Sequence, residues 1–207
     1  METELKYSVD EKRNAEDIFG DEEIIALKVG GSERLIPMHA VYFDTEDEDM
    51  SKNLMAMRIR LEGKTYVATL KWSGGSKDGL HRREEVNVPV DDEILIKKPG
   101  IDIFNRCEIF EQLKSITEDK DLIPVMEMKF TRREVRLNTG RSASVLSYDM
   151  GEIRADGKTA PISEIELELS HGDEEDFRKL GRKISEKYML PPEDVSKFQR
   201  GKLLMNK

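Results

Sequence analysis

Several residue types that define common protein classes are scarce in this chain of 207 residues. Cys107 is its only cysteine, which excludes an intramolecular disulfide framework and a cysteine-based zinc site. His39, His81 and His171 are far apart in the sequence, and we interpret them as ordinary strand or loop residues. No apolar run of membrane length and no signal peptide is present, so we expect a cytoplasmic protein with no membrane partner.

The balance of charge narrows the function classes further. Charged and hydrophobic residues each make up 37% of the chain, and its periodic segments indicate a folded domain rather than disorder. The net charge of -9 argues against a general nucleic-acid partner. The length predicts a single domain over residues 1–207, and a monomer and a homodimer are both compatible with it.

The apolar patterns alternate between strands and helices. Strands are predicted over residues 1–9, 23–29, 34–44, 55–62, 65–72, 82–90, 124–137, 143–149 and 162–170, with a loop over 73–79. Helices are predicted over 10–20, from the acidic run that ends at Asp49, over 92–120, around 177–188 and from near Glu193. This order predicts an α+β protein with a mainly antiparallel sheet that is closed or nearly closed.

Charged side chains alternate with apolar ones along several of these strands. In an extended strand alternate side chains share a face, so the opening segment places Glu2, Glu4 and Lys6 in one row. Such carboxylates suit a hard divalent cation, and the adjacent lysine suits the phosphate that this cation carries. The same alternation defines further rows, which are Arg58 with Arg60, Thr69 with Lys71, Arg83 with Glu85, and Glu164 with Glu166 and Glu168.

These rows have two interpretations. The simpler one is an ordinary half-exposed sheet whose charged side faces water. However, amphipathic helices in the sequence need an apolar surface to cover. If they cover the outside of a closed sheet, the charged rows face one another inside it. A charged lumen carries a large desolvation penalty unless its charges pair or bind ions and ligand, which predicts a polyanion and a metal there.

Together, these motifs resemble the CYTH, or triphosphate tunnel metalloenzyme, superfamily over nearly the whole chain. Glu2-Thr3-Glu4-Leu5-Lys6 is similar to the N-terminal E-x-E-x-K signature of that superfamily. The other motifs follow in the expected order, as Tyr42-Phe43-Asp44-Thr45, Met57-Arg58-Ile59-Arg60, Thr69-Leu70-Lys71, Arg83-Glu84-Glu85, Arg132, Asp149, Glu164-Ile165-Glu166-Leu167-Glu168, and Ser196-Lys197 with Arg200-Gly201.

The resemblance implies a fold and a set of roles. The fold would be a closed eight-stranded antiparallel β-barrel, a tunnel with a charged lumen, with helices packed outside and a C-terminal helix at the tunnel. One or two Mg²⁺ or Mn²⁺ ions would be held by Glu2, Glu4, Glu85, Asp149, Glu166 and Glu168. The substrate phosphates would be held by Lys6, Arg58, Arg60, Lys71, Arg83, Arg132, Lys197 and Arg200. Glu85, Asp149, Glu166 and Lys6 would form the catalytic group.

The resemblance favours metal-dependent hydrolysis of inorganic triphosphate to diphosphate and phosphate by water attack. We find no separate sequence element built to recognise a base or a ribose, and no Ser-His-Asp or Cys-His arrangement for a covalent intermediate. A thiamine or nucleoside triphosphatase and a class IV adenylate cyclase stay open, because they would share these residues. A module that binds polyphosphate or nucleotide without catalysis is the alternative of another class. Trp72 is interpreted as an edge packing residue rather than a stacking platform.

Overall fold

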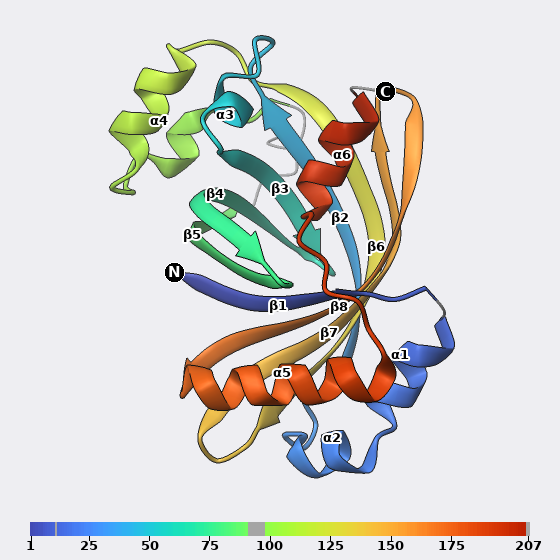
Figure 1. Cartoon of the computed structure of the whole chain (residues 1–207). Coiled ribbons are helices and arrows are strands. Elements are labelled where there is room, and N and C mark those ends of the chain that lie inside the picture. The colour runs from blue at the N-terminus through green and yellow to red at the C-terminus, as the bar shows by residue number, and fades with distance from the viewer. Residues whose placement is uncertain (11, 91–97, 206–207) are drawn as a thin grey trace.

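The sheet of this protein closes on itself. The computed structural model describes residues 1–10, 12–90 and 98–205. The described strands form a closed barrel in the order β1-β5-β4-β3-β2-β6-β7-β8, and β8 pairs with β1 (Figure 1). All of these pairings are antiparallel. The strands are β1 (Glu2–Ser8), β2 (Arg34–Asp44), β3 (Ala56–Glu62), β4 (Thr65–Lys77), β5 (Leu80–Val90), β6 (Ile123–Asn138), β7 (Ser142–Ala155) and β8 (Lys158–Gly172). The predicted α+β class and closed antiparallel barrel are confirmed.

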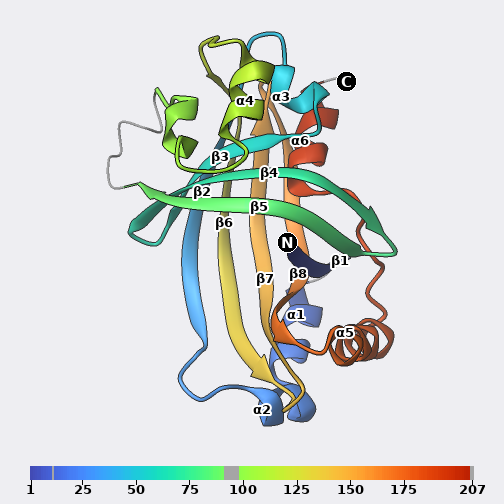
Figure 2. The same cartoon turned by 90° about the vertical axis from the view of Figure 1, so that its left-hand side faces the viewer.

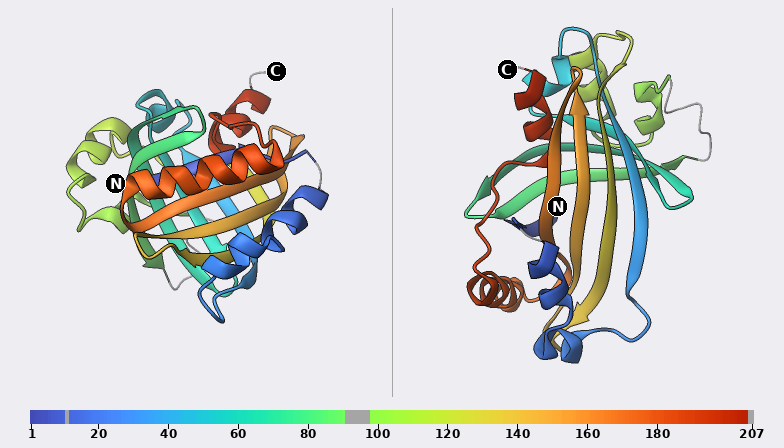
Figure 3. Two further views of the ribbon diagram at one scale, coloured as in Figure 1. Left: turned by 60° about the horizontal axis from the view of Figure 1, so that its bottom comes forward. Right: turned by 90° about the vertical axis from the view of Figure 1, so that its right-hand side faces the viewer.

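Helices cover the barrel in two separate groups. The helices are α1 (Lys12–Phe19), α2 (Glu22–Leu27), α3 (Asp49–Lys52), the short 3₁₀ helix η2 (Ile101–Phe104), α4 (Phe110–Thr117), α5 (Glu174–Tyr188) and α6 (Lys197–Met205). Figure 2 shows α3 and α4 at the end where β3, β4 and β5 cross the long strands β6 and β7. Figure 3 shows α5 lying across the opposite end, beside α1. None of the described helices combines the length and apolar character needed to span a bilayer.

The outside of the barrel supplies the apolar core at both ends. At one end, outward residues of β1 and β8 such as Leu5 and Leu167 pack against Phe177 of α5. The contact with α5 is close, because a Cβ atom added to Gly181 would lie 2.2 Å from Leu5 Cδ1. At the other end, Ile59 of β3 packs with residues of η2 and α4. Strand alternation therefore turns the charged rows inward, as the sequence analysis expected.

The C-terminal helix α6 packs against the lumen side of the barrel. A third apolar cluster joins Met126 of β6 and Ile153 of β7 to residues of α6. Gly201 permits this approach, because a Cβ atom there would lie 2.4 Å from Met126 Sδ. At the start of the helix, Phe198 stacks on Tyr42 of β2 with 5.1 Å between ring centroids. Part of the lumen is therefore apolar and covered by α6.

Two local predictions are wrong. The segment predicted as a strand over 23–29 contains helix α2, because the Asp21 side chain caps its N-terminus by accepting from the backbone N–H groups of Glu23 and Ile24. The segment 73–79, predicted as a loop, mostly extends the β4–β5 hairpin. A register shift between Trp72 and Gly74 bends β4 there. A Cβ atom at Gly74 would lie 2.2 Å from the carbonyl oxygen of Arg82, so the close approach requires glycine.

Other boundaries differ by smaller amounts. Within the range 92–120, predicted to be helical, the structure contains η2 and α4 joined by an irregular connection. Residues 91–97 lie outside the described residues. The last helix begins at Lys197 rather than near Glu193. The β7 strand continues to Ala155, beyond the predicted 143–149.

Candidate active site

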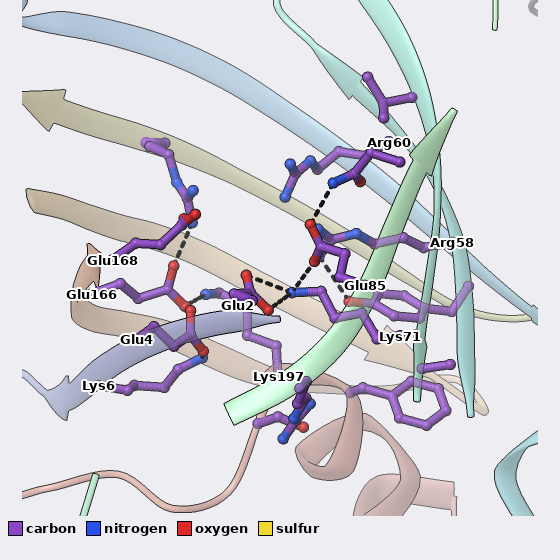
Figure 4. Close-up of a pocket in the computed structure, with 18 of the residues that line it drawn as sticks. Glu2, Glu4, Lys6, Arg58, Arg60, Lys71, Glu85, Glu166, Glu168 and Lys197 are labelled. Atoms are coloured by element: carbon purple, nitrogen blue, oxygen red, sulfur yellow. Dashed lines mark hydrogen bonds and ion pairs between the residues drawn. The ribbon is translucent and has the colours of Figure 1, made fainter. Parts of the chain in front are cut away.

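The lumen encloses a cavity of ≈ 370 Å³ lined mainly by charged side chains (Figure 4). They come from β1, β3, β4, β5, β6, β8 and α6. Of the fourteen site residues that the sequence analysis named, the cavity lining includes Glu2, Glu4, Lys6, Arg58, Arg60, Lys71, Arg83, Glu85, Arg132, Glu166, Glu168 and Lys197. Asp149 and Arg200 do not line it.

Pairing of β1 with β8 brings one group of carboxylates together. In the register of these strands Glu4 lies opposite Glu168, and Glu2 lies two residues farther along the same face of β1. We call Glu2, Glu4 and Glu168 the acidic row. Glu4 has a single, long ion pair with Lys6 at 3.4 Å. Within the described residues Glu168 has no ion-pair or hydrogen-bond partner.

Lys71 of β4 links the acidic row to the neighbouring strand β5. Its Nζ atom lies 2.7 Å from Glu2 Oε2 and 2.6 Å from Glu85 Oε2. The Asn87 side chain donates a second hydrogen bond to Glu85. Figure 4 shows Lys71 between the two carboxylates. Glu85 is therefore held against the cavity wall. Burial would raise its pKa, but the charge and hydrogen bond of Lys71, together with Arg58 and Asn87, lower it to about 2.

Two arginines of the lumen have no carboxylate partner among the described residues. Arg58 of β3 donates only to the Tyr42 hydroxyl, at 3.3 Å, and its Nε atom is buried without a hydrogen bond. Arg83 of β5 contacts only Nδ1 of His81, at 3.4 Å. Arg60, by comparison, pairs with Glu62. Guanidinium groups that lack an anion in a charged cavity suit the oxygen atoms of a phosphate chain.

A second group of carboxylates is fully paired. We call Asp149, Glu164 and Glu166 the buried cluster. Arg132 donates to both oxygens of Asp149 at 2.7 Å and to Glu166 at 2.6 Å. The three carboxylates could in principle hold a metal ion, since their oxygen atoms lie within 4.8 Å of one another. However, the cations that contact them, which are Lys6, Arg132, Lys197 and Arg200, already neutralise the group.

Neighbouring charges move the pKa values in this cluster strongly. Burial alone would raise the pKa of Glu166, but Lys197, Lys6 and Arg132 hold it well below its ordinary value. Burial alone would lower the pKa of Lys6, but Glu164 and Glu166 hold it well above its ordinary value. Glu166 and Lys6 therefore stay charged at neutral pH, and their ion pairs fix them in place.

Two carboxylates of the acidic row, Glu2 and Glu168, have the opposite pKa shift. For Glu4, burial would raise the pKa, but Lys6, Lys71 and His81 together lower it. Desolvation, together with the charges of Glu2 and Glu4, raises the pKa of Glu168 to about 7, although this residue of the cavity lining is partly open to solvent. Burial also raises the pKa of Glu2, against the opposing effect of Lys71. A hard divalent cation would relieve this excess of negative charge, and carboxylate oxygens are the donors that Mg²⁺ and Mn²⁺ prefer. The residues present therefore fit the implied metal.

Glu164 has no site role among those that the motifs imply. Its side chain has 0% exposure and contacts Lys6 at 3.2 Å, as well as Lys197 and Arg200. Alternation with Glu166 places Glu164 on the lumen face of β8. Alternation does not show how deeply a side chain is buried on that face. Tyr42 was quoted only as part of a motif, although its ring lines the cavity and its hydroxyl contacts Arg58.

Comparisons with known proteins agree with this geometry. A sequence model of the CYTH domain matches residues 1–201, so the chain belongs to the CYTH domain family. The chain is 32% identical over 166 residues to an inorganic triphosphatase from Haemophilus influenzae. That alignment covers 80% of this chain but only 45% of the relative, so the chain spans about half of that protein's length.

Solved structures share the fold at low sequence identity. A Hippeastrum protein reported to have a dominant triphosphatase activity superposes with a TM-score of 0.75 at 18% identity, over 98% of this chain and 96% of that one. A candidate adenylate cyclase from Bacillus halodurans gives a TM-score of 0.63 at 19% identity, over 97% of this chain and 96% of that one. These likenesses show the fold alone.

Proposed function

We propose that this protein hydrolyses inorganic triphosphate to diphosphate and phosphate, with Mg²⁺ or Mn²⁺ bound in the lumen. One observation carries the proposal. In one cavity Glu168 has no cation partner among the described residues and Glu4 has one ion pair, at 3.4 Å, while Arg58 and Arg83 have no carboxylate partner. A metal complex of a polyphosphate supplies both missing partners at once. The inorganic triphosphatase from Haemophilus influenzae supports the choice of substrate.

The metal would be held by Glu2, Glu4 and Glu168, with Glu85 as a further candidate that lines the cavity. The resemblance also implied Glu166, but its oxygens already contact Lys6, Arg132 and Lys197. A bound divalent cation would neutralise phosphate oxygens and favour attack by water. The resemblance also implied Asp149 as a ligand. Its two oxygens already accept from Arg132, so we propose instead that Asp149 holds that arginine.

The cations of the chain would bind and orient the phosphates. Arg58 and Arg83 are available to the substrate without giving up a carboxylate. Lys6 and Arg132 are held by the buried cluster, so their charges are in place before the substrate enters. In the reaction, water forms a bond to the terminal phosphorus and the bridging P–O bond breaks toward diphosphate. Fixed cations would stabilise the charge that develops on the leaving oxygen.

An organic triphosphate is a second candidate, favoured by one observation. A neighbouring cavity of ≈ 310 Å³ is lined in part by Leu54, Trp72 and Phe198. It shares Lys71 and Arg83 with the charged cavity. No sequence element for holding a base or a ribose was recognised. Trp72, predicted only to pack at an edge, both packs on the core and lines this cavity. An apolar cavity beside a phosphate site could accept the ring of a nucleotide or of thiamine.

Phosphate release tests both candidates. Inorganic triphosphate, ATP and thiamine triphosphate are compared with Mg²⁺, with Mn²⁺ and with excess chelator. We expect metal-dependent release that is fastest with inorganic triphosphate and is lost in Glu4→Gln. Faster release from either organic substrate would favour the second candidate. No release from any of the three would contradict both, and formation of cyclic AMP from ATP would then indicate a cyclase.

A further inference from the structure

Glu164 connects the barrel wall to the C-terminal helix through buried ion pairs. It lies on β8, opposite Asp149 of β7, and its side chain does not line the charged cavity. Its oxygens contact Lys6 of β1 at 3.2 Å, and Lys197 and Arg200 of α6. One carboxylate thus joins cations from two elements that are far apart in the sequence.

The three cations differ in what else they reach. Lys6 and Lys197 line the cavity and are 3% and 8% exposed, so a phosphate could contact them. Arg200 does not line the cavity, and Glu164 is its ion-pair partner. Its Nε atom is buried and has no hydrogen-bond partner. The charge of Arg200 therefore acts on Glu164, and through Glu164 on the two lysines.

The lysine side chains need such a holder. A lysine ammonium group ends a flexible four-carbon stem, and ordering it costs conformational entropy. A buried carboxylate that both ammonium groups share removes this freedom before the substrate arrives. Small displacements matter at such a site, because a shift of about 1 Å caused by a distant substitution can lower a rate about 10²-fold.

We propose that Glu164 is a positioning residue, which fixes Lys6 and Lys197 at the cavity wall, and that Arg200 affects the substrate only by holding Glu164. This assignment replaces the direct phosphate contact that the resemblance implied for Arg200. It rests on the proposed function to the extent that a triphosphate must bind in the cavity.

A double-mutant cycle separates this indirect role from a direct one. Glu164→Gln, Arg200→Gln and the double variant are compared with the wild type. The readouts are kcat and KM for inorganic triphosphate, and its affinity by titration calorimetry in excess chelator, where metal-dependent turnover is absent. We expect kcat/KM to fall about 10² -fold in Glu164→Gln and less in Arg200→Gln. The double variant should be no worse than Glu164→Gln, because Arg200 has nothing left to hold.

Lys183→Gln is the matched control. It removes one positive charge from α5 and breaks an ion pair with Glu23 at 2.7 Å, outside the lumen. Its kinetics should equal those of the wild type. Thermal unfolding of every variant is measured in parallel. If Glu164→Gln does not fold, Glu164→Asp takes its place in the cycle, because it retains the charge and shortens its reach by one carbon.

The outcomes separate this inference from the proposed function. If the losses in kcat/KM and affinity add in the double variant, or if Arg200→Gln weakens triphosphate binding while Glu164→Gln does not, the positioning role is overturned even though hydrolysis stands. If the wild type binds triphosphate with the expected non-additivity but releases no phosphate, hydrolysis is overturned and the positioning role stands. A wild type that neither binds nor hydrolyses triphosphate would overturn both.

Discussion

Glu166 and Glu168 lie two residues apart on one face of β8, yet their surroundings are opposite. Glu166 belongs to the buried cluster and contacts Lys6, Arg132 and Lys197, which hold its pKa well below the ordinary value against the effect of burial. Glu168 belongs to the acidic row, has no such partner among the described residues, and has its pKa raised to about 7, by desolvation first and by neighbouring carboxylates second. Identical residue types in one strand thus serve different purposes.

The difference separates structure from ligand binding. Cations that neutralise the buried cluster make it part of the folded framework, and breaking one such pair leaves a charge buried without a partner. In the acidic row the pKa values of Glu2 and Glu168 are raised, from which we infer that their negative charges oppose folding when no cation is bound. Substitutions in the two groups should therefore act on different quantities, the first on the free energy of unfolding and the second on metal-dependent activity.

Asp149→Asn should give the largest effect on stability. The substitution leaves Arg132 and Lys197 with one buried negative charge fewer, and breaking a buried pair costs about 3–5 kcal/mol of unfolding free energy. Denaturant unfolding at neutral pH measures this loss. A change below about 1 kcal/mol would show that the buried cluster is not the structural group that we infer.

Glu168→Gln should do the reverse. Because it removes a carboxylate from an acidic excess, we expect unfolding free energy without metal to stay the same or to rise. Metal-dependent phosphate release should fall about 100-fold, the scale of losing one charge-stabilising contact in an active site. Added Mg²⁺ or Mn²⁺ should raise the unfolding temperature of the wild type more than that of the variant. Equal stabilisation of both proteins by metal would place the ion elsewhere.

The cations allow the same comparison. Arg58→Gln and Arg83→Gln remove guanidinium groups that lack a carboxylate partner, so neither should destabilise the fold strongly. Each should weaken triphosphate binding, because a hydrogen bond to a charged group contributes about 1.5–3 kcal/mol, or roughly 10-fold to 100-fold. Steady-state KM values measure the effect. Arg154→Gln, which removes an exposed partner of Glu152, is the control and should match the wild type.

The sequence predicts the inward rows well, because strand alternation decides which side of a wall a residue occupies. Alternation does not predict how deeply each residue is buried, since Glu164 and Glu168 share a face but differ in exposure. The surroundings of each carboxylate depend on which cations from other strands and from α6 contact it. The sequence therefore could not show that Asp149 and Arg200 lie in ion pairs outside the cavity lining, which is the observation from which we propose holding roles for them.

Local errors have a similar cause. The apolar run at Glu23-Ile24-Ile25-Ala26-Leu27 suits a strand or a helix, and the Asp21 cap together with packing against the barrel selects the helix. The glycines after Trp72 suggested a loop, but Gly74 permits close backbone approach in a bent hairpin. In both places tertiary contacts decide between two local structures that the sequence allows.

Asp21→Asn should give the smallest effect and serves as a carboxylate control outside the lumen. Asp21 caps α2 and pairs with Lys187, which is half exposed. Asparagine is also a good cap, but the Asp21 side chain is buried, so the unfolding free energy should fall by about 1–2 kcal/mol, less than in Asp149→Asn.

The pH dependence of this effect follows from the pKa of Asp21. Burial alone would raise that pKa, but hydrogen bonds from Lys187, Tyr188 and the α2 backbone lower it below its ordinary 3.8. The contribution of the charge is therefore present above pH 3.8 and is lost as the pH falls through the folded value. The difference between Asp21→Asn and the wild type should shrink in acid, while both proteins keep full activity at neutral pH. A loss as large as that in Asp149→Asn would mean that stability depends on the number of carboxylates rather than on their burial among cations.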